Sequence, residues 1–302
     1  MSVPANSIPA AIPIPNAVAL TTPGPSLATT IAGAGPKVAL IGDSGTGKTF
    51  ALRTLIAAGI TPFIIATEQN FVQVMADMLG KTCHYKYVAP QAQQNWAHIK
   101  DMITKINTLS YENLTKSVDP FRQASNKFID LITMCNDFVC DCCQKSWGCV
   151  SAWNTDRAFC VDSFTGVSDM AFNLVVGNKP VRAMPDYQVA QNALRMFLGP
   201  LTSQTKCMVV IICHLEREKD ELTGGTFLTI KSVGQKVGPD LPRMFSDVIR
   251  TRRDANTFTW DTADTQSTVT ARNVPIASNQ KPDFGPLIEA WKKRGGQILV
   301  TP

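Results

Sequence analysis

The stretch KVALIGDSGTGKT, residues 37–49, decides the fold of this 302-residue chain. It opens with KVALIG (37–42), a short apolar strand that ends in glycine. The rest fits the pattern GxxxxGK followed by Ser or Thr at every fixed position. It comprises Gly42, Asp43, Ser44, Gly45, Thr46, Gly47, Lys48 and Thr49. A helix is expected at 50–59 and a second buried strand at 61–70, so the pattern predicts a βαβ unit in a mainly parallel sheet.

Each residue type in this loop has a mechanical reason. The glycines let the backbone curl, so that successive N–H groups point at phosphate oxygens. The helix that follows presents its positive N-terminal end to the same anion. Lys48 can reach the β- and γ-phosphates, and the Thr49 hydroxyl can ligate Mg²⁺. The loop therefore predicts binding of ATP or GTP without distinguishing the two bases.

Polar residues follow three further apolar strands. RAFCVDSF (157–164) carries Asp162 at its end, where a carboxylate can hold Mg²⁺ through water. Hydrolysis also needs a group that orients or deprotonates water. Glu68 closes the strand after the first helix, and we expect it beside the γ-phosphate. His214 closes the β-branched strand within 206–216, where it can sense the γ-phosphate and relay its presence to the next loop.

The remaining chain divides into an arm, a core and an insertion. Residues 1–36 are rich in Pro, Ala and Thr and are interpreted as a flexible arm. Residues 37–302 are interpreted as one ATPase domain with a mainly helical insertion at about 92–150. We expect a further helix at about 186–199. A C-terminal antiparallel set of short strands is expected at 248–253, 257–262 and 267–273.

Composition excludes several protein classes. Hydrophobic residues make up 44% and charged residues 18%, which is typical of a folded chain with a sizeable core. The chain has no uninterrupted apolar run of about 18 residues, so we expect no membrane-spanning helix and no membrane partner. Its start lacks a basic segment, and its nine cysteines are an odd number, so we expect a reducing cytoplasm. The net charge of +5 permits a nucleic-acid partner without demanding one.

These motifs together resemble the RecA-like branch of P-loop ATPases. That branch has a catalytic glutamate after the P-loop helix, which matches Glu68 in IIATEQN. Its Walker B acid matches Asp162 in FCVDS, and its polar strand-end residue matches His214 in VVIICHLERE. The match extends to the small phage-type members with single-strand-annealing relatives, through HLERE (214–218) and VGPDLPRMFSDVIRTRR (237–253). The resemblance covers roughly residues 37–90 and 157–290.

The resemblance implies an ATPase that uses ATP and Mg²⁺ (held by Thr49 and Asp162), assembles as a homo-oligomeric ring or filament, and acts on single-stranded DNA. It implies the host cytoplasm as the location if the chain is phage-encoded. In that branch the loops after the Walker B strand and the sensor strand line the DNA path, here 164–185 and 215–236. Their DNA-binding candidates are Lys179, Arg182, Lys219, Phe227, Lys231 and Lys236. A basic residue commonly completes the neighbouring subunit's site, and the candidates are Arg217, Lys219, Arg243, Arg250, Arg252 and Arg253.

Two other functions share the phosphate loop. One is a P-loop kinase-type phosphotransferase, which usually adds an arginine-bearing lid. The insertion contains a single arginine, Arg122, so it does not resemble such a lid and the kinase function is less favoured. The other is a nucleotide-dependent assembly module with little turnover, in which the arm and the insertion are partner surfaces.

Five cysteines fall within 15 residues: Cys135, Cys140, Cys142, Cys143 and Cys149. Cys140 and Cys143 have the spacing of half a zinc site, but no histidine lies between His98 and His214 to complete it. Cys135, Cys142 and Cys149 are seven apart, which predicts one face of a helix. Buried helical thiols behave as small apolar residues. We therefore do not expect this segment to bind zinc.

Overall fold

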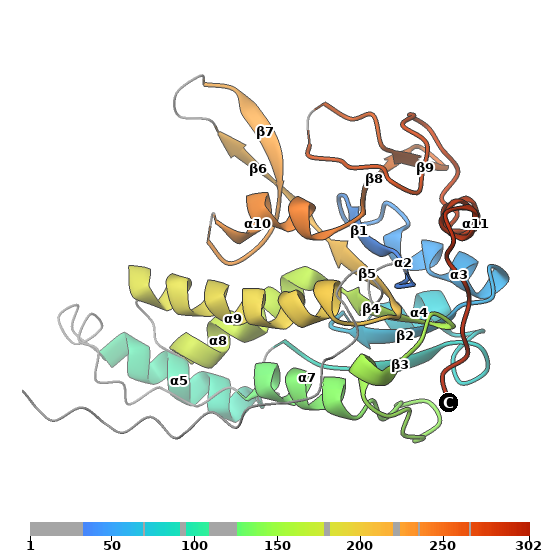
Figure 1. The fold of residues 1–302 in the computed structure, drawn as a ribbon. Helices are drawn as coiled ribbons and strands as arrows, with labels where there is room; N and C mark the ends of the chain where they lie inside the picture. Colours follow the sequence, from blue (N-terminus) through green and yellow to red (C-terminus); the bar gives the residue numbers. More distant parts are fainter. Residues whose placement is uncertain are drawn as a thin grey trace, which may run out of the picture.

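The computed structural model describes residues 33–68, 70–90, 95–108, 126–177, 182–219, 224–234, 236–265 and 267–302. The predicted arm at 1–36 lies almost wholly outside these residues. The core is a seven-stranded sheet with the order β3-β2-β4-β5-β1-β8-β9, and helices cover both of its faces (Figure 1). This arrangement confirms the predicted α/β class with a mainly parallel sheet.

Six of the seven strands are parallel, and β9 alone runs antiparallel to its neighbour β8. The three central strands are buried along their whole length because both faces of a parallel sheet are covered. The bounds are β1 Lys37–Ile41, β2 Thr61–Ala66, β3 His84–Tyr87, β4 Arg157–Asp162, β5 Met208–Cys213, β8 Asp247–Asp254 and β9 Thr257–Asp261.

Alternate residues of each strand face two hydrophobic cores, as the period of two requires. One core packs against α7 Lys127–Asn136, α8 Phe164–Val176 and α9 Met184–Ser203. The other packs against α2 Lys48–Ala51, α3 Arg53–Ala57, α4 Phe71–Met75 and α11 Gly285–Lys293. Three layers result. Three short elements lie in the connections. The 3₁₀ turn η1 Val150–Ala152 precedes β4, and α10 Val237–Asp240 and the 3₁₀ turn η2 Leu241–Met244 precede β8.

A separate two-stranded sheet stands out from the body of the molecule (Figure 1). It is the antiparallel hairpin of β6 Leu215–Lys219 and β7 Thr226–Ile230. Its first strand begins directly after His214, so much of the segment expected as a loop at 215–236 is a β-hairpin. Within the described residues, no helix is both long and apolar enough to cross a membrane.

The prediction of a loop at 164–185 is wrong over most of its length, because α8 occupies Phe164–Val176. Phe164, Val167 and Met170 recur at helical spacing and are fully buried against the sheet. The connection after Gly177 is therefore short, and of the two basic candidates there the structure describes Arg182, whereas Lys179 lies outside the described residues.

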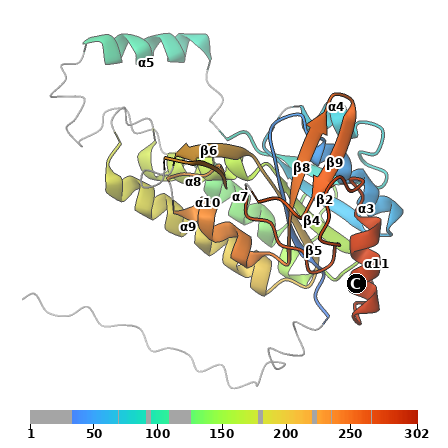
Figure 2. The same ribbon diagram turned by 90° about the horizontal axis from the view of Figure 1, so that it is seen from above.

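The described part of the predicted insertion, residues 95–108 and 126–150, contains two helices. Its helices are α5 Trp96–Thr108, which lies apart from the layered core in Figure 2, and α7. Helix α7 ends at Asn136, and Val139 then pairs with Ser146 in a tight hairpin. The prediction that Cys135, Cys142 and Cys149 share one helix face is therefore wrong.

The predicted third C-terminal strand at 267–273 does not form. Ser267 and Thr270 make single bridges to Leu228 and Val248. Both edges of β8 are already taken, one by β1 and the other by β9, so no long edge is left for a further strand. For the same reason β8 belongs to the main sheet rather than to a separate antiparallel set.

Candidate functional site

The loop between β1 and α2 has the backbone that its glycines predict. Gly45 and Gly47 have φ angles of 76° and 81°, in the left-handed region that glycine adopts without strain. A Cβ on Gly47 would lie 3.0 Å from the Phe258 ring, and one on Gly42 would lie 2.2 Å from Thr251 Oγ1. Glycine is therefore required here both by the backbone and by the packing of β8 and β9 under the loop.

Lys48 points back over this loop. Its Nζ donates to the carbonyl oxygens of Gly42 at 2.8 Å and Asp43 at 2.6 Å. The side chain is buried, and burial lowers its pKa, while the Asp162 carboxylate acts in the opposite direction. A buried ammonium held by carbonyl oxygens above a curled glycine loop fits an anion such as a phosphate.

Thr49 and Asp162 form a pair of oxygen donors next to Lys48. Thr49 Oγ1 donates to Asp162 Oδ2 at 2.6 Å. Asp162 is the last residue of β4 and is 3% exposed. Burial raises the pKa of its carboxyl to about 6, although the Thr49 hydrogen bond and Lys48 lower it. A hydroxyl and a carboxylate in contact fit Mg²⁺, which takes oxygen ligands and keeps most of its waters.

Glu68 is held from two sides. Its Oε1 accepts a hydrogen bond from Ser163 Oγ at 2.8 Å and from His214 Nε2 at 2.9 Å. These residues follow β2, β4 and β5, which are neighbours in the sheet, so the three strand ends meet at one edge. The hydrogen bonds from His214 and Ser163 hold the pKa of Glu68 below its ordinary value. The result is an ionised carboxylate with a fixed orientation and a partly exposed side chain.

The structure thus brings together the phosphate loop, Asp162, Glu68 and His214, as the sequence predicts. It adds Ser163, Thr67 and Thr251, which the sequence analysis missed. Ser163 donates its N–H to Thr67 Oγ1 at 2.9 Å, and Thr67 donates its N–H to the Asp162 carbonyl at 2.6 Å. Ser163 could have been found as the polar neighbour of the strand-end acid, but Thr67 and Thr251 carry no sequence signal.

Four of the DNA-binding candidates lie on or next to the hairpin and α8. Lys219 and Phe227 are in β6 and β7, and Phe227 is 42% exposed. Lys231 and Arg182 both act on the carboxyl of Asp169 in α8, partly offsetting the burial that raises its pKa. Helix α8 contacts the segment after β7, because the Val233 N–H donates to Ser168 Oγ at 2.7 Å. Lys236 is exposed just before α10.

Three candidates for completing a neighbour's site are paired with acids of their own chain, and a fourth lies over an aromatic ring. Arg250 contacts Asp264 at 2.6 Å, and Arg252 contacts Asp264 at 2.8 Å. Arg253 lies over the Phe258 ring at 5.4 Å. Arg243 pairs with Asp240 at 3.4 Å, and its side chain is 69% exposed. These contacts give Arg250 and Arg252 a role in the fold of β8 and β9.

Comparison with known proteins agrees with this geometry. The family model described as AAA domain matches residues 34–274. No curated protein matches the sequence. The matched span runs from the residues before β1 to beyond β9, so it contains the phosphate loop, Asp162, Glu68 and His214. The chain belongs to the AAA domain family, whose general activity is that of nucleotide-binding ATPases.

Proposed function

We propose that this chain hydrolyses ATP with the help of Mg²⁺ at the carboxyl edge of β1, β2, β4 and β5. The observation that carries the proposal is the position of Glu68, which Ser163 and His214 hold at 2.8 Å and 2.9 Å beside the phosphate loop. Binding alone does not need a carboxylate that is oriented by two hydrogen bonds. Hydrolysis does, because attacking water must be oriented and deprotonated.

The binding half of the proposal rests on the loop and on the Thr49–Asp162 pair. The N–H groups at residues 44–48 and the Lys48 ammonium would hold the β- and γ-phosphates. Thr49 and Asp162 would hold Mg²⁺, which neutralises phosphate charge when bound. The two oxygens are 2.6 Å apart, whereas neighbouring ligands of octahedral Mg²⁺ are about 2.9 Å apart. Direct binding by both therefore needs the pair to open slightly and the Thr49 hydroxyl proton to turn away.

Glu68 has the protonation state that its proposed role needs. Its lowered pKa keeps it ionised at neutral pH, so it can accept a proton from water. A kinase-type phosphotransferase also uses an ionised carboxylate, which accepts a proton from the hydroxyl of the second substrate, so this feature supports both reactions. It also favours turnover over an inert assembly module.

His214 connects the site to the β6–β7 hairpin. The carbonyl oxygen of His214 accepts a hydrogen bond from the Lys231 N–H at 2.8 Å, which closes the base of the hairpin. A change at the Glu68–His214 contact is thus one residue away from β6. We propose that this hairpin binds single-stranded DNA, with Phe227 stacking on a base and with Lys219, Lys231 and Arg182 meeting phosphates. Lys179 and Lys236 extend the same set.

We also propose that the chain works as a homo-oligomer in which a basic residue completes the neighbouring subunit's site. Acids of the same chain already pair with Arg243, Arg250 and Arg252, so Arg217 and Lys219 are the better candidates. A ring and a filament would both satisfy this geometry.

The test is ATP hydrolysis with and without single-stranded DNA, for the intact chain, Lys48→Ala and the exposed control Lys81→Ala. We expect DNA to stimulate turnover and Lys48→Ala to lower it by about 100-fold or more, because Lys48 is the phosphate ligand. Lys81→Ala should match the intact chain. Turnover that ignores DNA at low and moderate salt would remove the DNA proposal alone. Normal turnover by Lys48→Ala would remove the ATPase proposal.

A further inference from the structure

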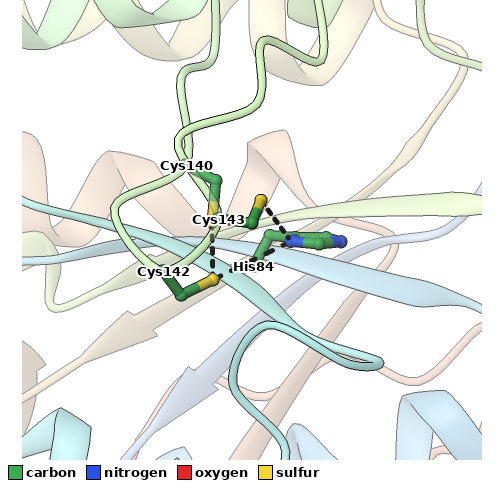
Figure 3. Close-up of side chains that lie close together, drawn as sticks. All are labelled: His84, Cys140, Cys142 and Cys143. Atoms are coloured by element: carbon green, nitrogen blue, oxygen red, sulfur yellow. Dashed lines mark hydrogen bonds between the residues drawn. The ribbon is translucent and has the colours of Figure 1, made fainter.

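Four side chains from two distant segments converge beside the edge strand β3 (Figure 3). They are His84, Cys140, Cys142 and Cys143. One ligand atom of each lies within 4.8 Å of those of the other three. His84 begins β3, and the cysteines belong to the turn that follows α7. The histidine that the sequence analysis did not find near the cysteines is thus supplied by another strand.

The spacing of the ligand atoms suits a tetrahedral zinc ion. His84 Nδ1 is 3.8 Å from Cys143 Sγ and 4.0 Å from Cys142 Sγ. With Zn–S of about 2.3 Å and Zn–N of about 2.1 Å, a nitrogen and a sulfur on one zinc are about 3.6 Å apart. All four ligand types belong to the Cys₃His set of structural zinc sites.

One distance must open for zinc to bind. Cys140 Sγ and Cys142 Sγ are 2.7 Å apart, whereas two sulfurs on one zinc are about 3.8 Å apart. They are also farther apart than the roughly 2.0 Å of a disulfide. Cys142 is only partly buried, so a small rotation about its χ1 can move its sulfur.

Backbone contacts hold the cysteine turn on β3 without any metal. The Asp141 N–H donates to the Tyr85 carbonyl at 2.8 Å. The Asp141 carboxylate accepts from the Tyr87 N–H at 2.8 Å and from Lys86 Nζ at 2.5 Å. Within the turn, the Gln144 N–H donates to the Cys140 carbonyl at 2.9 Å. The ligands that flank Asp141 are therefore placed in advance, which is what a metal site needs.

Aromatic packing fixes the histidine. The His84 ring lies 4.9 Å from the Phe63 ring and 4.3 Å from the Trp147 ring, centroid to centroid. In Figure 3 its nitrogen faces the sulfurs. The cations of Lys145 and Arg157 lie over the same Trp147 ring at 4.2 Å and 5.2 Å. Three thiolates on one Zn²⁺ leave a net negative charge, and these cations would offset it.

We propose that His84, Cys140, Cys142 and Cys143 bind a structural Zn²⁺ ion that clamps the insertion to the edge of the sheet. Four protein ligands leave no open position on the metal, so its role is in the fold rather than in catalysis. The expectation that the cysteines are only small apolar residues rested on a helix that ends at Asn136. The proposal does not depend on the ATPase activity.

Zinc content of the full chain tests the proposal. The protein is purified without added metal, dialysed against a weak chelator, and its zinc is measured by plasma mass spectrometry. We expect about one zinc per chain. Cys143→Ser should lower this at least about fivefold, because one ligand of four is lost. The matched control is Cys149→Ser, which changes a partly buried cysteine of the same segment outside the four ligands and should keep the zinc.

Cobalt provides a readout that does not require a folded variant. Metal-free intact chain titrated with Co²⁺ should gain the visible absorption of a tetrahedral cobalt–thiolate centre. Intact chain that neither holds zinc nor gains this absorption would overturn the proposal. So would a Cys140–Cys142 disulfide in zinc-free protein as purified, or equal zinc in Cys143→Ser and Cys149→Ser. Lys48→Ala should keep its zinc, so failure of the ATPase proposal and failure of this one are separate results.

Discussion

The polar groups at the carboxyl edge of β2, β4 and β5 satisfy one another, whereas the cluster beside β3 has no strong partners of its own. Glu68 accepts hydrogen bonds at 2.8 Å and 2.9 Å, and Asp162 accepts one at 2.6 Å. At β3, His84 Nδ1 faces sulfurs at 3.8 Å and 4.0 Å, and thiols are weak donors and acceptors.

This difference separates what a ligand does at each place. The carboxyl edge of β2, β4 and β5 is held together by its own hydrogen bonds, so we expect its ligand to matter more for the proposed reaction than for the stability of the fold. The cluster of His84 and the three cysteines is assembled by the backbone of a turn, and its side chains gain strong bonds only when a cation arrives. Removing the cation should therefore lower the stability of the fold more than it lowers ATP hydrolysis.

The largest effect is expected for Glu68→Gln. Glutamine keeps the size of the side chain but cannot take a proton from water, so turnover should fall by about 10²–10⁴-fold. Nucleotide affinity should stay close to that of the intact chain, because Lys48, Thr49 and Asp162 are unchanged. Steady-state hydrolysis together with equilibrium binding of a labelled nucleotide measures both. Glu289→Gln on the surface of α11 is the control, and a Glu68→Gln variant that keeps a tenth or more of the normal rate would contradict the role of Glu68.

The next effect is on stability, after zinc is removed by a strong chelator. At about 1,000 times the dissociation constant a ligand adds about 4 kcal/mol to the stability of the folded state. For a chain of this size, Tm should drop by roughly 10 °C. Cys143→Ser should start low and respond little to the chelator, while Lys48→Ala should behave as the intact chain does. An unchanged Tm in the intact chain would mean that the cluster beside β3 holds no ion that stabilises the fold.

The candidate site at the carboxyl edge of the sheet was largely predictable, because its residues belong to short local motifs. The phosphate loop is a run of eight residues, and Asp162 and His214 each come at or directly after a buried apolar strand. Parallel strands share one carboxyl edge, which predicts that these side chains lie on the same side of the sheet. Their direct contacts also need β2, β4 and β5 to be neighbours, and this order comes from tertiary structure. Glu68 was placed at the end of its strand, and it lies two residues beyond β2.

The cluster beside β3 was not predictable in the same way. It needs β3 to be an edge strand, the chain to leave α7 at Asn136, and the turn to dock on Tyr85 and Tyr87. Each of these three features depends on tertiary packing, which the seven-residue spacing of the cysteines does not predict. The helix α8 was missed for another reason: a loop was carried over from the resemblance, although Phe164 and Val167 already had helical spacing.

A smaller effect, of opposite sign, is expected for Asp162→Asn. Burial raises the pKa of Asp162 from 3.8 to about 6. Between these pH values the folded chain binds the extra proton, so the free energy of unfolding falls as pH rises through this window. About one pH unit above this pKa, the buried carboxyl is almost wholly ionised. Asparagine should therefore stabilise the nucleotide-free protein at pH 7 by about 1–3 kcal/mol, and should do little at pH 4.

Urea unfolding of the intact chain and Asp162→Asn at pH 4 and pH 7 measures this difference. The exposed control Asp254→Asn should shift neither curve. Hydrolysis should be lost in Asp162→Asn even as stability rises, because the carboxylate serves the metal and not the fold. If Asp162→Asn is less stable than the intact chain at pH 7, the Asp162 carboxylate stabilises the fold. It would then resemble the Asp247 carboxylate, which accepts hydrogen bonds from the backbone and side chain of Asn273.

The smallest effect is expected for Thr251→Val, which tests whether even the local loop depends on a distant strand. Thr251 Oγ1 on β8 lies 2.7 Å from Thr46 Oγ1 and 3.2 Å from the Ile41 carbonyl. Valine keeps the shape and removes both contacts, so about 1 kcal/mol of support for the loop should be lost. Nucleotide affinity should fall about fivefold, and Thr257→Val at the exposed start of β9 should leave it unchanged. Equal affinities in the two variants would mean that the glycines and Lys48 shape the loop without help from β8. The local sequence of the loop would then be enough to determine its structure.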